Sequence, residues 1–147
     1  MERRAQELIE SLALEPHPEG GFYRQVFKSP HIVNGNRSAI TAIHFLLPQG
    51  ARSRWHRVTS DEIWVNVEGG GVALHTFNGN ATRTQRLGAT LPFAVVDAGV
   101  WQAAEPLDGF ALVACFVAPG FEFADFSMMS EEPEVATRLP AELRRLV

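Results

Sequence analysis

The sequence predicts a single all-β domain over residues 1–147, an antiparallel barrel or sandwich framed by short terminal helices. About nine short segments alternate apolar and polar residues, as strands with one buried face do. Turns rich in Gly, Pro and Asn separate these segments about every eight to twelve residues. Helical spacing of apolar residues occurs only near the ends of the chain. These three observations together predict an antiparallel barrel or sandwich.

The N-terminal part begins with an amphipathic helix. Residues 4 to 14 place Ala5, Leu8, Ile9 and Leu12 at helical spacing among charged residues. Pro16 and Pro18 end this helix, and a rigid turn over 14–21 leads into a strand at 22–27. Residues 29–37 have loop composition. Residues 38–47 form the next predicted strand, which is more hydrophobic than the one before it.

The rest of the chain reads as strands until residue 129. A motif at 53–64 is followed by a glycine turn at 68–71 and by a predicted hairpin that joins 72–77 to 82–87. Further strand-like segments occupy 91–96, 100–104 and the apolar run 110–118. Ser130 with Pro133 and nearby carboxylates is a helix-start signal. The tail 140–147 is expected to form a last helical turn.

The composition limits the class of partner. Hydrophobic residues make up 46% and charged residues 20%, and the formal net charge of -4 does not suit a nucleic-acid or anionic membrane surface. Cys115 is the only cysteine, so no intrachain disulfide forms, and its apolar surroundings predict a buried small hydrophobe. No signal peptide and no membrane-spanning run are expected. We therefore predict a cytoplasmic protein without nucleic-acid or membrane partners.

Residues 53–64 hold the densest chemistry in the chain. At strand periodicity, Glu62, Trp64 and Asn66 share one face. A solvated face rarely carries Trp, and a plain core rarely carries Glu. This mixture predicts the inside of a barrel that holds a ligand, with Trp55 and Trp64 as apolar walls.

His56 and Glu62 are the first candidate pair. Imidazole and carboxylate suit zinc, manganese, iron or nickel, and they equally suit an acid/base pair in which the carboxylate orients the ring. The alternative is a histidine at the barrel rim, with Glu62 in a salt bridge to Arg54 or Arg57.

Four more residues are candidate ligand contacts. The Gln102 amide suits a substrate carbonyl or a weak metal contact, or it caps unpaired backbone groups. Tyr23 is a candidate general acid and Arg24 suits a carboxylate or phosphate, although Tyr23 also fits an aromatic residue at an interface. His44, like His75, lies in an alternating strand and either reaches the barrel interior or serves as a core or surface histidine. His17 and His31 lie in predicted loops and are assigned no role.

Four blocks of the sequence, in order from about residue 5 to residue 127, together resemble one family. They are Glu15-Pro16-His17-Pro18-Glu19-Gly20-Gly21-Phe22-Tyr23-Arg24, then Ser53-Arg54-Trp55-His56-Arg57 with Asp61-Glu62-Ile63-Trp64, then Ala98-Gly99-Val100-Trp101-Gln102-Ala103-Ala104, and Val117-Ala118-Pro119-Gly120-Phe121-Glu122-Phe123. The chain resembles the small single-domain cupins of unknown function, the fifth cupin group. The resemblance implies a double-stranded β-helix, or jelly-roll barrel, that is usually a homodimer. An N-terminal strand exchanged between subunits is expected by the same analogy.

The resemblance also implies where metal ligands would lie. In the wider cupin superfamily, one motif has two histidines and a glutamate, and a second has Pro-x-Gly-x-x-His. His56 and Glu62 match the first motif, but Val58 replaces its second histidine. In the second motif Asp97 replaces the proline and Gln102 replaces the histidine, which leaves His56, Glu62 and Gln102 as a weaker metal-binding set.

Three functions follow from these features. The first is a cupin that binds a small polar metabolite in the barrel, with or without help from a divalent metal and with or without turnover. The second is a metal-independent isomerase with His56 as base and Tyr23 as acid, similar to the deoxysugar-nucleotide epimerases. The third is a non-enzymatic metabolite-binding module.

Overall fold

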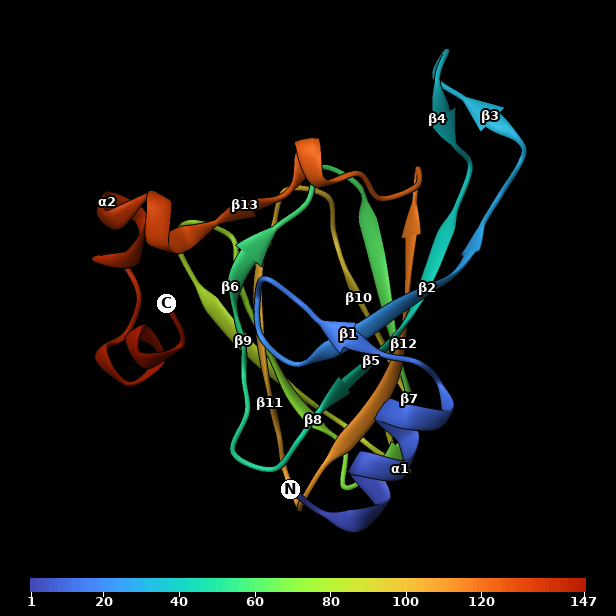
Figure 1. Cartoon of the computed structure of the whole chain (residues 1–147). Coiled ribbons are helices and arrows are strands. Elements are labelled where there is room, and N and C mark those ends of the chain that lie inside the picture. The colour runs from blue at the N-terminus through green and yellow to red at the C-terminus, as the bar shows by residue number, and fades with distance from the viewer.

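The computed structural model describes residues 1–147, and two antiparallel sheets face each other to form a jelly-roll barrel (Figure 1). The larger sheet has the order β1-β2-β5-β12-β7-β10, the smaller sheet has the order β13-β6-β11-β8-β9, and β3 pairs with β4 alone. The strands are β1 (Glu15–Pro16), β2 (Phe22–Lys28), β3 (Ile32–Val33), β4 (Arg37–Ser38), β5 (Thr41–Leu47), β6 (Ser53–Arg57), β7 (Asp61–Gly69), β8 (Val72–Phe77), β9 (Thr82–Leu87), β10 (Phe93–Val96), β11 (Trp101–Pro106), β12 (Ala111–Ala118) and β13 (Ser127–Met128). The predicted all-β jelly roll is confirmed.

The helices lie at the ends of the chain, as the sequence indicates. They are α1 (Arg3–Ser11), η1 (Phe123–Asp125), η2 (Met129–Glu131), α2 (Pro133–Ala136) and η3 (Ala141–Leu146). None of them is long and apolar enough to cross a membrane. The loop predicted at 29–37 is in part a small ribbon, β3 with β4, that projects away from the barrel in Figure 1.

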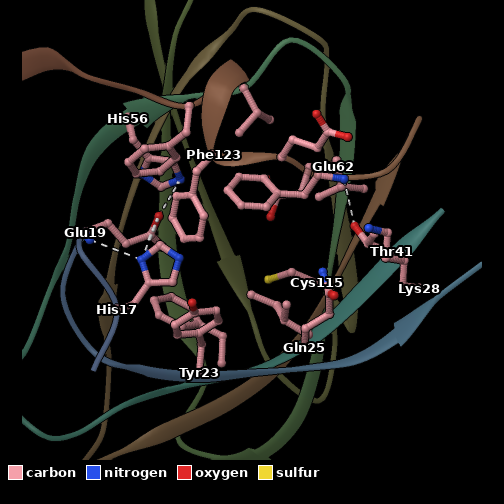
Figure 2. Close-up of a pocket in the computed structure, with 17 residues that line it drawn as sticks. His17, Glu19, Tyr23, Gln25, Lys28, Thr41, His56, Glu62, Cys115 and Phe123 are labelled. Atoms are coloured by element: carbon pink, nitrogen blue, oxygen red, sulfur yellow. Dashed lines mark hydrogen bonds and ion pairs between the residues drawn. The ribbon is translucent and has the colours of Figure 1, made fainter. Parts of the chain in front are cut away.

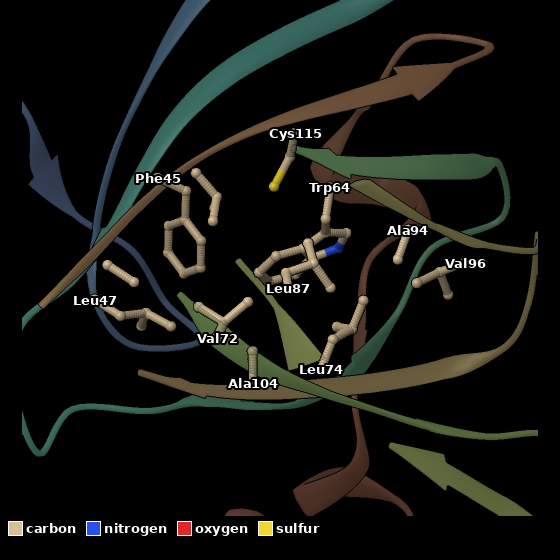
Figure 3. Packing of buried hydrophobic residues seen from close by; sticks show 12 residues of the cluster. Phe45, Leu47, Trp64, Val72, Leu74, Leu87, Ala94, Val96, Ala104 and Cys115 are labelled. Atoms are coloured by element: carbon tan, nitrogen blue, oxygen red, sulfur yellow. The ribbon is translucent and has the colours of Figure 1, made fainter. Parts of the chain in front are cut away.

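Alternation along the strands separates an interior from two outer faces. The interior is filled at one end by Phe45, Leu47, Trp64, Val72 and Leu74, which lie together in Figure 3. Their burial supplies most of the driving force for closing the two sheets on each other, at roughly 1.5–3 kcal/mol for each fully buried large side chain.

The outer faces are covered locally by the terminal helices. Ala5 and Leu8 of α1 pack against Leu46 and Leu112 on the larger sheet. On the smaller sheet, Trp55 packs among apolar residues of the C-terminal segment and its indole N–H donates to the Leu143 carbonyl at 2.9 Å. Since Trp55 and His56 are neighbours on one strand, this contact turns His56 into the barrel.

The sheet is complete within one chain at its N-terminal edge. β2 pairs with β5 over six registered residue pairs, and β1 pairs with β2. The strand exchange expected by analogy is therefore not needed to satisfy the backbone of β5.

Candidate functional site

The end of the barrel that the core leaves unfilled holds a cavity of about 280 Å³ (Figure 2). It lies between the segment 17–19, the strands β2, β5, β6, β7 and β12, and the segment 121–126. Polar side chains that line it are His17, Glu19, Tyr23, Gln25, Lys28, Thr41, His56, Glu62 and Glu122. Its apolar walls include Phe45, Phe121, Phe123 and Phe126. A cavity that combines aromatic walls with a few converging polar groups is typical of a small-molecule site.

Two glycines bring the segment that carries His17 and Glu19 against the barrel. Gly20 and Gly21 have positive φ of 115° and 72°. A Cβ on Gly20 would lie 2.1 Å from the Arg52 carbonyl oxygen, which excludes any larger residue there. The Arg54 backbone N–H then donates to the Glu19 carbonyl at 2.8 Å and fixes the segment along β6.

Glu19 and His56 form the closest titratable pair in the cavity. His56 Nε2 lies 3.0 Å from Glu19 Oε2, and the two side chains are 3% and 7% exposed. The His56 Nδ1–H donates to the Arg54 carbonyl at 2.7 Å, so Nε2 of the neutral ring faces Glu19 as an acceptor. The Ser53 hydroxyl donates to the other Glu19 oxygen at 2.8 Å. Two acceptors cannot face each other at this distance, so one proton is shared between Nε2 and Oε2.

Burial decides where that proton resides. It raises the pKa of Glu19 to about 8, against the opposing effects of the Ser53 hydrogen bond and the Arg54 charge. Burial also lowers the pKa of His56, a shift that the nearby Glu62 carboxylate opposes. Both directions favour a protonated Glu19 beside a neutral His56 at neutral pH.

Glu62 is the second carboxyl of the cavity. Burial raises its pKa to about 7, with the charge of His56 opposing that rise. The Gln102 amide N–H donates to Glu62 Oε1 at 2.9 Å, and the Trp64 indole N–H donates to Gln102 Oε1 at 2.7 Å. These two hydrogen bonds orient the Glu62 carboxyl from the side away from the cavity. The thiol of Cys115, whose pKa burial raises, also contacts this carboxyl.

His17 contributes a neutral imidazole to the same cavity. Burial lowers its pKa to about 3, and the charge of His56 adds to the effect. Its Nδ1 accepts the Glu19 backbone N–H at 3.1 Å, so the ring proton lies on Nε2. The Tyr23 ring packs edge-on against His17 with a centroid separation of 4.4 Å, and Phe126 stacks on His56 at 5.4 Å. The neutral rings and the aromatic walls keep the charge density of the cavity low.

The structure brings together only some of the residues selected from the sequence. His56, Glu62 and Tyr23 all line the cavity. Gln102 hydrogen-bonds to Glu62 and does not itself line the cavity. The expected apolar walls differ as well, because Trp64 lies in the core and Trp55 faces the C-terminal segment.

Three other selected residues lie away from the cavity. Arg24 is exposed, and its guanidinium reaches only the Ala13 carbonyl. His44 alternates with the cavity residues Ile43 and Phe45 along β5 and therefore points to the opposite face of the sheet. Asn66 does not line the cavity, and its side-chain oxygen is buried without a partner.

His17, Glu19 and Lys28 are cavity residues that the sequence did not reveal. The signal for the first two was an imidazole and a carboxylate within a rigid Pro–Gly turn, in a block that also carried the family resemblance. Periodicity assigns no face to a turn, so their direction could not be predicted. Lys28 could not be placed from sequence because the register of β2 shifts between Gln25 and Phe27, which changes the face on which Lys28 lies.

The family model described as "Cupin superfamily (DUF985)" matches residues 6–129, most of the chain. The chain belongs to this family. This cupin is similar to an uncharacterized protein of Saccharomyces cerevisiae, YML079W, with 26% identity over 88% of this chain and 77% of that protein. Among solved structures, a hypothetical protein from Leishmania major has a TM-score of 0.88 and 30% identity, covering 97% of this chain and 98% of that one. Protein SO0799 from Shewanella oneidensis has a TM-score of 0.84 and 35% identity, covering 91% and 89%.

The side chains of this cupin do not fit the metal site expected from the resemblance. Of the three expected ligands, Gln102 turns its oxygen to Trp64 and its N–H to Glu62. Both ring nitrogens of His56 already have partners, Arg54 and Glu19. No group of three or more His, Cys, Asp or Glu side chains is arranged to hold a metal ion. Buried titratable groups with shifted pKa values, such as these, occur both in acid/base sites and in structural networks.

Proposed function

We propose that this cupin binds a small metabolite in the barrel and catalyses proton transfer on it without a metal ion. The observation that carries the proposal is the buried Glu19–His56 pair at 3.0 Å beside a second buried carboxyl, Glu62. General acids and bases work best when their pKa lies near the working pH, and burial brings both carboxyls into that range.

The role of each side chain follows from which of its polar atoms has no hydrogen-bond partner within the protein. Glu62 Oε1 is bonded to Gln102, while His56 has both ring nitrogens engaged. Glu62 is therefore the base that meets the substrate, in place of the His56 predicted from sequence. The Glu19–His56 pair supplies the proton that the substrate oxygen receives. Tyr23 and Thr41 are the hydroxyl side chains that line the cavity.

A carbonyl compound with an acidic α-C–H bond suits these roles. Glu62 takes the α-proton, the C–H electron pair forms a C=C bond, and the carbonyl π electrons move to oxygen. The oxygen receives the proton of the Glu19–His56 pair. If Glu62 returns the proton to the same carbon and the hydroxyl proton passes back to Glu19, the result is exchange of the α-proton. If Glu62 delivers the proton to the neighbouring carbon of an enediol and the neighbouring hydroxyl proton passes to Glu19, the result is an isomerisation that consumes no co-reactant.

Exchange of substrate protons in D₂O tests this proposal. A panel of 2-oxo acids, hydroxy ketones and aldoses is incubated with the protein, and loss of the α-proton signal is followed by ¹H NMR. Wild type should exchange at least one member of the panel, and Glu62→Gln should slow that rate by about 10²–10⁴-fold. Glu68→Gln is the matched control, because Glu68 lies on the same strand and pairs with Arg4 on the surface.

Three results would count against the proposal. They are exchange that survives Glu62→Gln, retained binding without any exchange, and near-stoichiometric metal in the untagged protein that His56→Ala removes. The second of these would identify a metabolite-binding module, and the third would restore metal assistance.

We also propose that the protein forms a homodimer through the outer face of the larger sheet. Ile63 and Val67 on β7 and Phe93 and Val95 on β10 are all exposed there, on neighbouring registered strands. Contiguous exposed apolar residues mark interaction surfaces. Light scattering after size exclusion should give a dimer that Phe93→Asp converts to monomer. A wild-type monomer at micromolar concentration would contradict the proposal.

A further inference from the structure

A bulge in β2 directs one exposed basic side chain to the mouth of the cavity. Tyr23 and Gln25 alternate inward, and Gln25 pairs with Ile43 of β5. The register then shifts, so that Phe27 pairs with Ala42 and Lys28 with Thr41. Without the extra residue, the alternation would place Phe27 inside and Lys28 outside. β-Bulges commonly re-aim side chains next to functional sites.

Lys28 is unusual among the basic residues of the chain. It is the only lysine, and no arginine lines the cavity. Its backbone pairs with Thr41, but its ammonium group forms no ion pair or hydrogen bond with another residue of the chain. The rim carboxylate of Glu122 is instead paired with Arg37 Nε at 3.8 Å. The positive charge at this side of the cavity is therefore not neutralised by the protein.

The rest of the cavity suits an apolar body more than a second charge. Figure 2 shows Lys28 beside Thr41, across the cavity from Glu19 and His56. Phenylalanine side chains line the space between, and the two buried carboxyls hold raised pKa values that reduce their negative charge. An anionic ligand thus meets one cation and little repulsion.

We infer that the cavity takes a small carboxylate whose planar apolar part lies among the phenylalanines and whose carboxylate pairs with Lys28. The inference rests on the proposed use of this cavity as a ligand site, but it does not require turnover. A carboxylate fits better than a phosphate monoester, because a phosphate carries a charge of about -1.5 to -2 at pH 7 and would call for more donors than one ammonium. In this arrangement the substrate is anchored at one end of the cavity, while the carbon that bears the acidic C–H bond approaches Glu62.

Phenylpyruvate is the probe, because it combines an aromatic ring, a carboxylate and an acidic α-C–H bond. Its affinity is measured by calorimetry at pH 7 beside its methyl ester, which lacks the charge. Lys28→Met should weaken phenylpyruvate binding about tenfold or more and leave ester binding unchanged, while Lys28→Arg should retain most of the affinity. Arg24→Met is the matched control, since Arg24 lies on the same strand and outside the cavity.

The inference is overturned if wild type shows no saturable binding of phenylpyruvate, if Lys28→Met binds it as tightly as wild type, or if Arg24→Met weakens binding equally. Tighter binding of phenyl phosphate than of phenylpyruvate would also overturn it and assign the anchor to phosphate. Lys28-dependent binding without proton exchange supports the inference and defeats the proposed catalysis. If neutral carbonyl compounds exchange their protons and Lys28→Met does not alter that rate or the binding of phenylpyruvate, the proposed catalysis is supported and the role of Lys28 is overturned.

Discussion

Two histidine–glutamate pairs in this protein have the same separation and opposite surroundings. His56 Nε2 lies 3.0 Å from Glu19, and His75 Nε2 lies 3.0 Å from Glu105. The first pair lines the cavity, where Arg54 donates to the Glu19 backbone carbonyl and no guanidinium donates to the Glu19 carboxyl. The second lies under the C-terminal segment, where Arg145 donates to Glu105 at 2.8 Å and Thr84 contacts the other ring nitrogen.

The charge partners, and not the separation, determine what each pair can do. The hydrogen bond from Arg145 lowers the pKa of Glu105, so that carboxylate stays ionised and holds the C-terminal segment to the sheet. Burial without such a partner raises the pKa of Glu19 to about 8, so its proton can be exchanged near neutral pH. A short His–Glu distance alone therefore does not identify an active site.

The largest expected difference between the pairs is in activity. Glu19→Gln preserves the shape and the Ser53 hydrogen bond but removes the exchangeable proton, so it should slow substrate proton exchange by about 10²–10⁴-fold. Glu105→Gln should leave the exchange rate unchanged. Equal rates for the two variants, measured by ¹H NMR in D₂O, would remove the distinction between the pairs.

The next effect is on the pH dependence of stability. The folded pKa of Glu19, about 8, lies above its ordinary value of 4.5, so its stabilising contribution is complete below pH 4.5 and is lost as the pH rises to about 8. His17, with its lowered pKa, acts in the opposite sense but only below pH 6.5. The free energy of unfolding should therefore fall by about 1.4 kcal/mol per pH unit for Glu19 between pH 6.5 and 8.

Urea unfolding at pH 6.5 and 8 measures this slope. Glu19→Gln should reduce it, because the amide does not titrate. Glu105→Gln should leave it in place, since the lowered pKa of Glu105 affects stability only in acid. A stability that rises between pH 6.5 and 8 would mean that Glu19 is ionised in the folded protein.

Removing the carboxylate of the second pair has a moderate effect on stability. Glu105→Ala deprives Arg145 and His75 of their shared acceptor and should lower the free energy of unfolding by about 1–2 kcal/mol. The loss should appear in urea unfolding at pH 7 while substrate proton exchange continues. A variant as stable as wild type would show that this pair does not fasten the C-terminal segment.

The smallest effect concerns a histidine that belongs to neither pair. His44 Nδ1 is buried without a hydrogen-bond partner on the outer face of β5. Replacing it by Leu removes an unpaired polar atom and should raise the free energy of unfolding by about 1 kcal/mol without altering proton exchange. A loss of stability that depends on protein concentration would instead place the missing partner of His44 in a second subunit.

Most of the fold could be predicted from sequence because alternation and turns are local signals. The structure has the N-terminal helix and the strands from β5 to β12 in the order expected. The family resemblance is also confirmed. His56 and Glu62 could be selected for the same reason, since each sits on a regular strand whose inward face is marked by its neighbours.

The rest of the site depends on events that periodicity does not encode. His17 and Glu19 reach the cavity through a glycine turn that folds back on β6, and the β2 bulge turns the exposed Lys28 toward the cavity mouth. The direction of His44 depends on which parity of β5 faces the core, a choice fixed only when the sheets close on each other. These directions are set by tertiary packing and not by local sequence, and the residues concerned are the ones that could not be placed correctly from sequence.

Glu19 and His56 share a proton that we place on Glu19 at neutral pH. ¹⁵N NMR of the histidine rings tests it directly, with the His56 signals assigned by their loss in His56→Gln. We expect a neutral His56 ring at pH 7, protonated on Nδ1, whose Nε2 signal changes as Glu19 titrates near pH 8. An imidazolium protonated on both nitrogens at pH 7 would instead place the shared proton on His56 and leave Glu19 ionised.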